Sequence, residues 1–143
     1  MLNKLTFGLL VCCITLLAGC QPHKMDLHGK WSYRSHVTGD PIIFDFKPNE
    51  NLEITFSRQN APTTAVISYA FSGKYQAEPD SLSIQIKEPS ADDYMGGLAH
   101  FQLDILVPQF LFEKPSPKFN FASSDQFILT SASGEKVVMD RVK

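Results

Sequence analysis

Short runs in which apolar residues recur at every second position constrain the fold of this chain more than any other feature. Residues 42–46 and 52–56 follow this pattern, with polar residues such as Asp45 between the apolar ones. A period of two places the apolar side chains on one face of a β-strand, whereas a helix would distribute them around its axis. The intervening segment 48–51 contains the proline and asparagines typical of tight turns. We therefore predict a β-hairpin over residues 42–57.

The same alternation continues through the rest of the chain. Further strands are expected around Trp31 and over residues 65–76, 82–86, 101–107 with a continuation over 110–112 after an interruption at Pro108, 119–121, 127–129 and 137–139. No segment after residue 20 shows a helical period. These eight or nine short strands predict an all-β fold, an antiparallel up-and-down meander of about eight strands closing into a small barrel, because closure removes exposed strand edges. A β-sandwich is the alternative.

Gly73 lies inside the strand expected over residues 65–76. A glycine in the interior of a strand often marks a bulge or a sharp bend. We therefore expect the sheet to curl at this position.

The N-terminal segment has the layout of a secretory signal. Lys4 precedes an apolar run over residues 7–17, which is too short for a membrane-spanning helix of about 20 residues. The sequence Leu17-Ala18-Gly19-Cys20 resembles the lipobox of bacterial lipoproteins, in which the cysteine carries acyl chains such as palmitate and begins the mature chain. We expect residues 1–19 to be a signal peptide, 20–26 a lipidated tether and 27–143 a single domain.

This resemblance also implies a location. Lipoproteins retained in the inner membrane of Gram-negative bacteria often carry aspartate directly after the lipidated cysteine, whereas this chain has Gln21. The expected location is the outer membrane, on its periplasmic face, with attachment through the lipid on Cys20. Since Cys12 and Cys13 leave with the signal, no thiol remains for a disulfide, and stability must come from packing.

Two parts of the domain resemble lipocalin-like barrels. Gly29-Lys30-Trp31 matches the Gly-x-Trp opening of the first strand in that family, and Arg141 lies where the family carries an arginine over the tryptophan. The resemblance implies that Gly29, Trp31 and Arg141 close one end of the barrel. An indole face attracts a guanidinium, which gives this pairing a physical reason. The chain looks most similar to the small lipocalin-like domains of bacterial lipoproteins.

The sequence lacks the residue patterns that several classes of function require. The chain has 13 basic and 15 acidic residues and no basic run, so a nucleic-acid partner is not expected. Its four histidines show no spacing of metal ligands, so we expect no metal site and no cofactor. The Ser-x-x-Lys sequence at residues 133–136 lies in an expected turn without its companion motifs, so we expect no enzymatic activity.

Two functional hypotheses remain open. The eleven phenylalanines favour a packed core or an apolar cavity, and the second case predicts a lipid-anchored module that binds an apolar small molecule or a lipid. The alternative is an accessory interaction, assembly or inhibitor lipoprotein that acts through a surface loop and has no ligand cavity. The long irregular segment 88–97 is the candidate interaction loop, with Asp92, Asp93, Tyr94 and Met95 at its centre.

Overall fold

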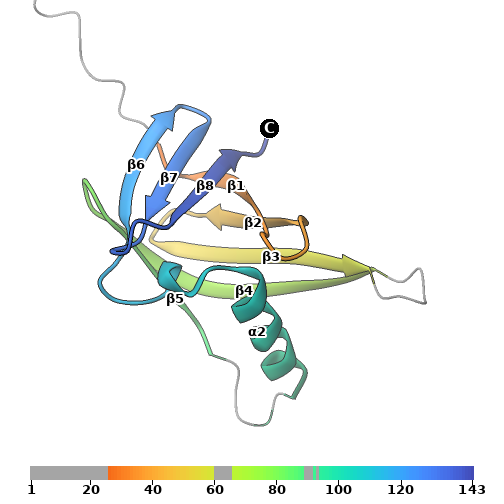
Figure 1. The fold of residues 1–143 in the computed structure, drawn as a ribbon. Coiled ribbons are helices and arrows are strands. Elements are labelled where there is room, and N and C mark those ends of the chain that lie inside the picture. Colours follow the sequence, from red (N-terminus) through yellow and green to blue (C-terminus); the bar gives the residue numbers. More distant parts are fainter. Residues whose placement is uncertain (1–25, 60–65, 89–91, 93) are drawn as a thin grey trace, which may run out of the picture.

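The computed structural model describes residues 26–59, 66–88, 92 and 94–143 (Figure 1). The expected signal peptide, Cys20 and most of the expected tether lie outside this part of the chain. No helix within the described part is long and apolar enough to cross a membrane.

Eight antiparallel strands form one sheet. The strands are β1 (Gly29–Arg34), β2 (Pro41–Phe46), β3 (Asn51–Gln59), β4 (Val66–Ala77), β5 (Leu82–Ile86), β6 (Lys118–Ser123), β7 (Gln126–Thr130) and β8 (Lys136–Arg141). Their order across the sheet is β5-β4-β3-β2-β1-β8-β7-β6, so the first and last strands pair within it. The predicted up-and-down meander of about eight strands is confirmed.

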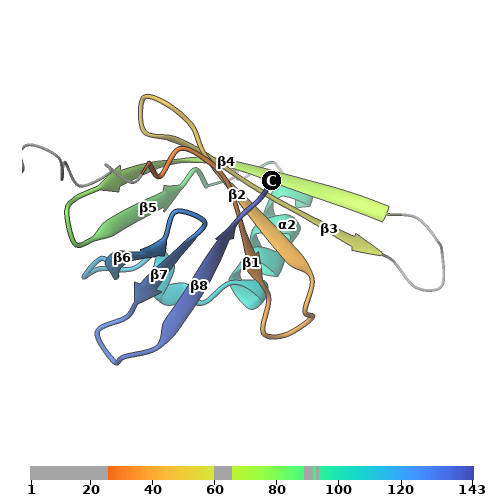
Figure 2. The ribbon, with the colours of Figure 1, turned by 90° about the horizontal axis from the view of Figure 1, so that it is seen from above.

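The sheet curls into a half-barrel, which brings its edge strands β5 and β6 toward each other (Figure 2). An isolated bridge joins Ser81 to Lys118. Beside it, the Leu82 N–H donates to the Pro117 carbonyl at 3.2 Å, and the Phe119 N–H donates to the Asp80 carbonyl at 2.8 Å. The two edges are thus joined at one end of β5.

Prolines explain why this pairing does not continue along β5. Extending the register of the bridge would place Pro117 opposite Leu82 and Pro115 opposite Ile84. A proline has no N–H and cannot donate to the carbonyl that faces it. The half-barrel therefore stays open along the rest of β5.

Gly73 lies in a continuous part of the β-ladder without a bulge, and the curl expected at this residue stays a prediction. Gly73 pairs with Leu52 on β3 and with Ile86 on β5, and the register is continuous on both sides. A Cβ atom at residue 73 would collide with the backbone carbonyl of Gln85. The backbone of β5 thus lies over this glycine, where any side chain would keep the two strands apart.

Aromatic rings fill the concave side of the sheet. The centroid of the Phe127 ring lies 4.6 Å from that of Trp31 and 6.1 Å from that of Phe46, and Phe46 lies 5.0 Å from Tyr75. These four side chains come from β7, β1, β2 and β4 and are all buried. Side chains rather than free space therefore occupy this part of the interior.

The strand predicted over residues 101–107 is wrong, as is the prediction that no helix follows residue 20. Helix α2 (Tyr94–Leu106) occupies this segment and lies beside β4 and β5 (Figure 1). Ala99, Leu103 and Leu106 are buried, and their spacing of four and three residues is that of one helical face.

The reason for this error lies on the other face of α2. Phe101 and Ile105 are 63% and 47% exposed, so the apolar residues at alternate positions belong to two opposite faces of a helix. The continuation of this strand expected over residues 110–112 is also wrong, because the 3-10 helix η1 (Gln109–Leu111) covers most of it.

Candidate functional site

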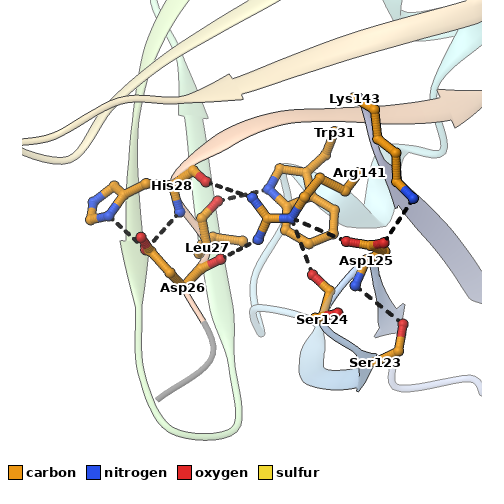
Figure 3. Close-up of polar contacts among 9 residues, drawn as sticks. All are labelled: Asp26, Leu27, His28, Trp31, Ser123, Ser124, Asp125, Arg141 and Lys143. Carbon is orange, nitrogen blue, oxygen red and sulfur yellow. Dashed lines mark hydrogen bonds and ion pairs between the residues drawn. The ribbon is translucent and has the colours of Figure 1, made fainter. Parts of the chain in front are cut away.

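Trp31 lies fully buried at the end of the half-barrel where the described chain begins (Figure 3). Its Nε1–H donates to the Leu27 carbonyl at 2.7 Å. The Phe127 ring packs against the indole edge to face, and the guanidinium carbon of Arg141 lies 4.2 Å from the indole centroid. The only polar atom of the indole is thus satisfied, and the ring is covered by an aromatic and a cationic group.

The Arg141 guanidinium also fixes two backbone segments through three carbonyls (Figure 3). It donates to the carbonyl of Asp26 at 2.6 Å, to that of His28 at 3.0 Å and to that of Ser124 at 3.1 Å. Asp26 and His28 directly precede β1, and Ser124 lies in the turn between β6 and β7. Arg141 therefore ties the start of the domain to the C-terminal strands.

Gly29 provides the space for this arrangement. Its φ of +111° lies in a region that residues with a side chain rarely adopt, and an added Cβ would lie 3.3 Å from Nη1 of Arg141. The structure thus places Gly29, Trp31 and Arg141, the three residues singled out in the sequence, in one cluster. Each has a structural role there, and the cluster leaves no opening for a ligand between Trp31 and Arg141.

Asp26 contributes a local electrostatic interaction at the same end. Its carboxylate accepts a hydrogen bond from the His28 backbone N–H at 3.0 Å and lies 2.7 Å from Nδ1 of the same histidine. The backbone hydrogen bond is the main reason that the pKa of Asp26 falls below its usual value. Its side chain is 67% exposed, so the interaction with His28 is screened by solvent.

A groove of about 420 Å³ lies at the open edge of the half-barrel, between β5, α2 and η1. Its lining residues are Ile84, Gln85, Ile86, Glu88, His100, Leu103, Asp104, Gln109 and Phe112. The volume falls within the range of about 300 to 1,000 Å³ that is usual for small-molecule sites. The groove exists because α2 and η1, rather than a further strand, lie beside β5.

The groove combines an apolar lining with acidic groups. Ile84 and Leu103 are buried apolar residues of this lining. Glu88 and Asp104 supply carboxylates, and Nδ1 of His100 lies 3.6 Å from Oδ2 of Asp104. Since no lysine or arginine belongs to the lining, the fixed charges around the groove are negative.

Beyond the bridge at Ser81, the outer edge of β5 is not paired with another described strand. The Lys87 N–H donates to the Ser72 carbonyl on β4, whereas the Leu82 N–H points the other way, to Pro117. Because successive residues of a strand alternate in direction, the N–H and C=O groups of Ile84 and Ile86 also point away from β4. Within the described residues, the outward N–H groups of these two isoleucines have no backbone partner.

The candidate interaction loop is shorter than the sequence suggests. Asp92 is an exposed turn residue, whereas Tyr94 and Met95 begin α2. Asp93 lies outside the described residues, as do the positions of the Tyr94 and Met95 side chains. Asp92 is not part of the groove lining, although Glu88 at the start of the predicted loop is.

Sequence reasoning did not identify the groove residues. Its lining contains residues from 84–88 and from 100–112. These two segments lie close together because of helix α2, which the alternating apolar pattern did not predict. The spacing of Ala99, Leu103 and Leu106 was the signal for that helix. Among the described residues, no three His, Cys, Asp or Glu side chains gather as metal ligands.

No protein-family model matches the chain, and no curated protein matches its sequence. Among solved structures, the chain is similar to a lipocalin-like protein from Bacteroides uniformis ATCC 8492, with 16% identity and a TM-score of 0.47, over 81% of this chain and 98% of that one. It is also similar to an uncharacterized protein from Bacteroides eggerthii DSM 20697, with 18% identity and a TM-score of 0.46, over 82% of this chain and 100% of that one.

Proposed function

We propose that this chain is a lipid-anchored binding module of the cell envelope, which holds an apolar small molecule or a segment of lipid in the groove between β5 and α2. The observation that carries this proposal is the groove itself, an open space of about 420 Å³ in whose lining Ile86 and Phe112 are only partly buried and keep apolar surface that a ligand could cover. Burial of apolar ligand surface contributes roughly 25 cal/mol per Å², so such a lining favours an apolar ligand.

The proposed location rests on the sequence. The lipobox resemblance at Cys20 supports acylation of this residue, and Gln21 supports transfer to the outer membrane, on its periplasmic face. Arg141 holds the backbone at Asp26, six residues after Cys20, so the proposed tether joins the domain at a fixed point. The module would bind its ligand without chemical conversion, nucleic acid or cofactor.

Displacement of a neutral apolar dye tests the proposal. The chain from Gln21 onward is titrated with N-phenyl-1-naphthylamine, whose fluorescence rises in an apolar site. We expect saturable binding that Gln109→Trp weakens, because Gln109 is an exposed residue of the groove lining whose side chain donates to the Asp104 carbonyl of the same lining, so a tryptophan there would occupy part of the groove. Val138→Trp is the matched control, since Val138 is 41% exposed on β8 and not part of the lining. Equal binding by both variants would contradict the proposal.

The outer face of α2 supports the alternative of an interaction module. Leu98, Phe101 and Ile105 are 42%, 63% and 47% exposed, and their spacing places them on one face of the helix. Exposed apolar residues that gather in this way mark protein contact surfaces. The double variant Phe101→Ser/Ile105→Ser should then lose an envelope partner in a pulldown while its dye binding stays unchanged. A pulldown that is the same for both proteins would remove this alternative.

A further inference from the structure

We propose that the ligand of the groove is an amphiphile whose hydrocarbon part lies in the groove and whose protonated amine faces the carboxylate of Asp104. This inference rests on the proposed function and names the chemical class of the small molecule or lipid. Two features of the described residues carry it: the apolar surface of the lining and the negative charge beside that surface.

The charged residues of the lining are both acidic. Glu88 follows β5 and Asp104 belongs to α2, whereas no lysine or arginine lines the groove. Lys87, the neighbour of Glu88 in the sequence, is not part of the lining. Among the described residues, no lysine or arginine forms an ion pair with Glu88 or Asp104. Negative charge that no basic side chain compensates favours a cationic group on the ligand.

The carboxylate of Asp104 is accessible to such a group. Its side chain is 42% exposed, and its Oδ2 lies 3.6 Å from Nδ1 of His100, beyond the range of a hydrogen bond. The Gln109 amide donates to the backbone carbonyl of Asp104 at 2.9 Å and not to this carboxylate. The Nε2 of Gln109 is thus engaged, while its Oε1 can accept a further donor. An ammonium group has three N–H donors and can bind a carboxylate and an amide oxygen together.

The same lining offers apolar surface to the rest of the ligand. Ile86 and Phe112 are only partly buried, so a hydrocarbon chain can cover them, and removal of this surface from water favours binding. A wholly apolar ligand that reached Asp104 would take its carboxylate out of water without a partner, which is unfavourable. An ammonium at the end of the hydrocarbon chain supplies that partner through a charge-assisted hydrogen bond.

Three ligands with the same hydrocarbon chain test the charge preference. At pH 8, decylamine carries a positive charge, decanol none and decanoate a negative one. Each ligand, below the concentration at which it forms micelles, is titrated against N-phenyl-1-naphthylamine bound to the chain from Gln21 onward, which contains every described residue. We expect decylamine to displace the dye at a concentration about threefold or more below that of decanol, and decanoate to require the highest concentration. Added NaCl should reduce these differences.

Variants that differ by one charge locate the preference. Asp104→Asn keeps the size of the side chain and should remove most of the difference between decylamine and decanol, while decanol binds as before. Asp40→Asn is the matched control, because it changes the net charge equally at an exposed position between β1 and β2 that is not part of the lining. Glu88→Gln should also reduce the difference, because Glu88 adds to the negative charge of the lining. Unchanged decanol binding shows that each variant is folded.

The outcomes separate the inference from the function on which it rests. Equal displacement by the three ligands, or strongest displacement by decanoate, would overturn the preference for an amine. An unchanged preference in Asp104→Asn, or an equal loss in Asp40→Asn, would overturn it as well. In each of these cases the proposed function stands as long as Gln109→Trp weakens binding of the dye. If Gln109→Trp binds the dye as the unaltered chain does, the proposed function fails and the inference fails with it.

Discussion

The guanidinium of Arg141 covers the indole of Trp31, with 4.2 Å between the guanidinium carbon and the ring centroid. The same guanidinium donates three hydrogen bonds to backbone carbonyls on both sides of the ring. Trp31 and Arg141 face each other across the pairing of β1 with β8, at a directly paired position. This contact therefore links the start of the domain to its last strand, which lie far apart in the sequence.

Replacing Trp31 should destabilise the domain strongly. Trp31→Ala removes a fully buried indole that contacts Phe127 and Arg141, and we expect a loss of roughly 3 to 5 kcal/mol in the free energy of unfolding. Urea denaturation followed by circular dichroism measures it. Val138→Ala, at an exposed position of β8, should change stability by less than about 0.5 kcal/mol. A negligible change for Trp31→Ala would contradict the described packing.

Arg141 should not be replaceable by lysine. A lysine keeps the charge but cannot donate in the planar geometry that reaches the carbonyls of Asp26, His28 and Ser124. We expect Arg141→Lys to lose most of the stability that Arg141→Ala loses. A double-mutant cycle with Trp31→Ala should give a coupling energy of about 0.5 to 2 kcal/mol, and additive effects would show that the two residues do not interact.

Gly73 should tolerate no side chain. In Gly73→Ala the new Cβ would meet the carbonyl of Gln85, so β4 and β5 would have to separate, at a cost of roughly 1 to 3 kcal/mol. Thermal unfolding measures this loss. Gly97→Ala is the control, because nothing lies within 4 Å of a Cβ added there. Equal unfolding temperatures for the two variants would contradict the close approach of β5 to Gly73.

Tyr75 should make the domain sensitive to alkaline pH. Burial, followed by the charges of Asp26 and Glu50, raises the pKa of its hydroxyl above the ordinary value of 10.0, and the hydroxyl donates to the Lys47 carbonyl at 2.9 Å. The unfolded chain therefore ionises first as pH rises above about 10, and stability falls until the pH passes the raised pKa of the folded state.

Urea denaturation at pH 9 and at pH 11 measures this effect. Tyr75→Phe should lose less stability between the two pH values than the unaltered chain does. The pKa of Tyr33 is also raised, mainly by burial, so part of the alkaline sensitivity should remain and should fall further in Tyr33→Phe/Tyr75→Phe. An unchanged slope in the double variant would assign the sensitivity to other groups.

Cys20 should determine where the protein is found. Cys20→Ser removes the thiol that the lipobox resemblance identifies as the acylation site, so we expect loss of the acyl mass and altered processing of the N-terminus. Mass spectrometry of the intact protein, with separation of the inner and outer membranes, measures both. Cys13→Ser lies within the expected signal peptide and is the control. Identical masses and fractionation for the two variants would contradict lipidation at Cys20.

The sequence predicted the strands well and the open side of the sheet poorly. β2 and β3 each have one face on the core, so alternation alone revealed them. In α2, Phe101, Leu103 and Ile105 alternate with polar residues as they would in a strand, because the exposed face of this helix is also apolar. The type of this element was therefore set by its packing in the fold rather than by its local pattern.

The Trp31–Arg141 cluster and the groove also differ in how well the sequence predicted them. Gly29, Trp31 and Arg141 were identified through a resemblance at the two ends of the domain, and the structure brings them together. The groove depends on the position of β5, whose backbone lies against Gly73, and on the position of α2, neither of which a strand pattern contains. Its residues could be recognised only once the edge strands and the helix were placed in space.

Mapping the bound dye by NMR tests the central claim most directly. Amide chemical shifts of the chain from Gln21 onward are followed during titration with N-phenyl-1-naphthylamine. If the groove between β5 and α2 is the ligand site, the saturable shifts should cluster at residues 84–88 and 100–104. Shifts centred on the interior residues Phe44 and Phe127, or no saturable shift at all, would contradict the claim.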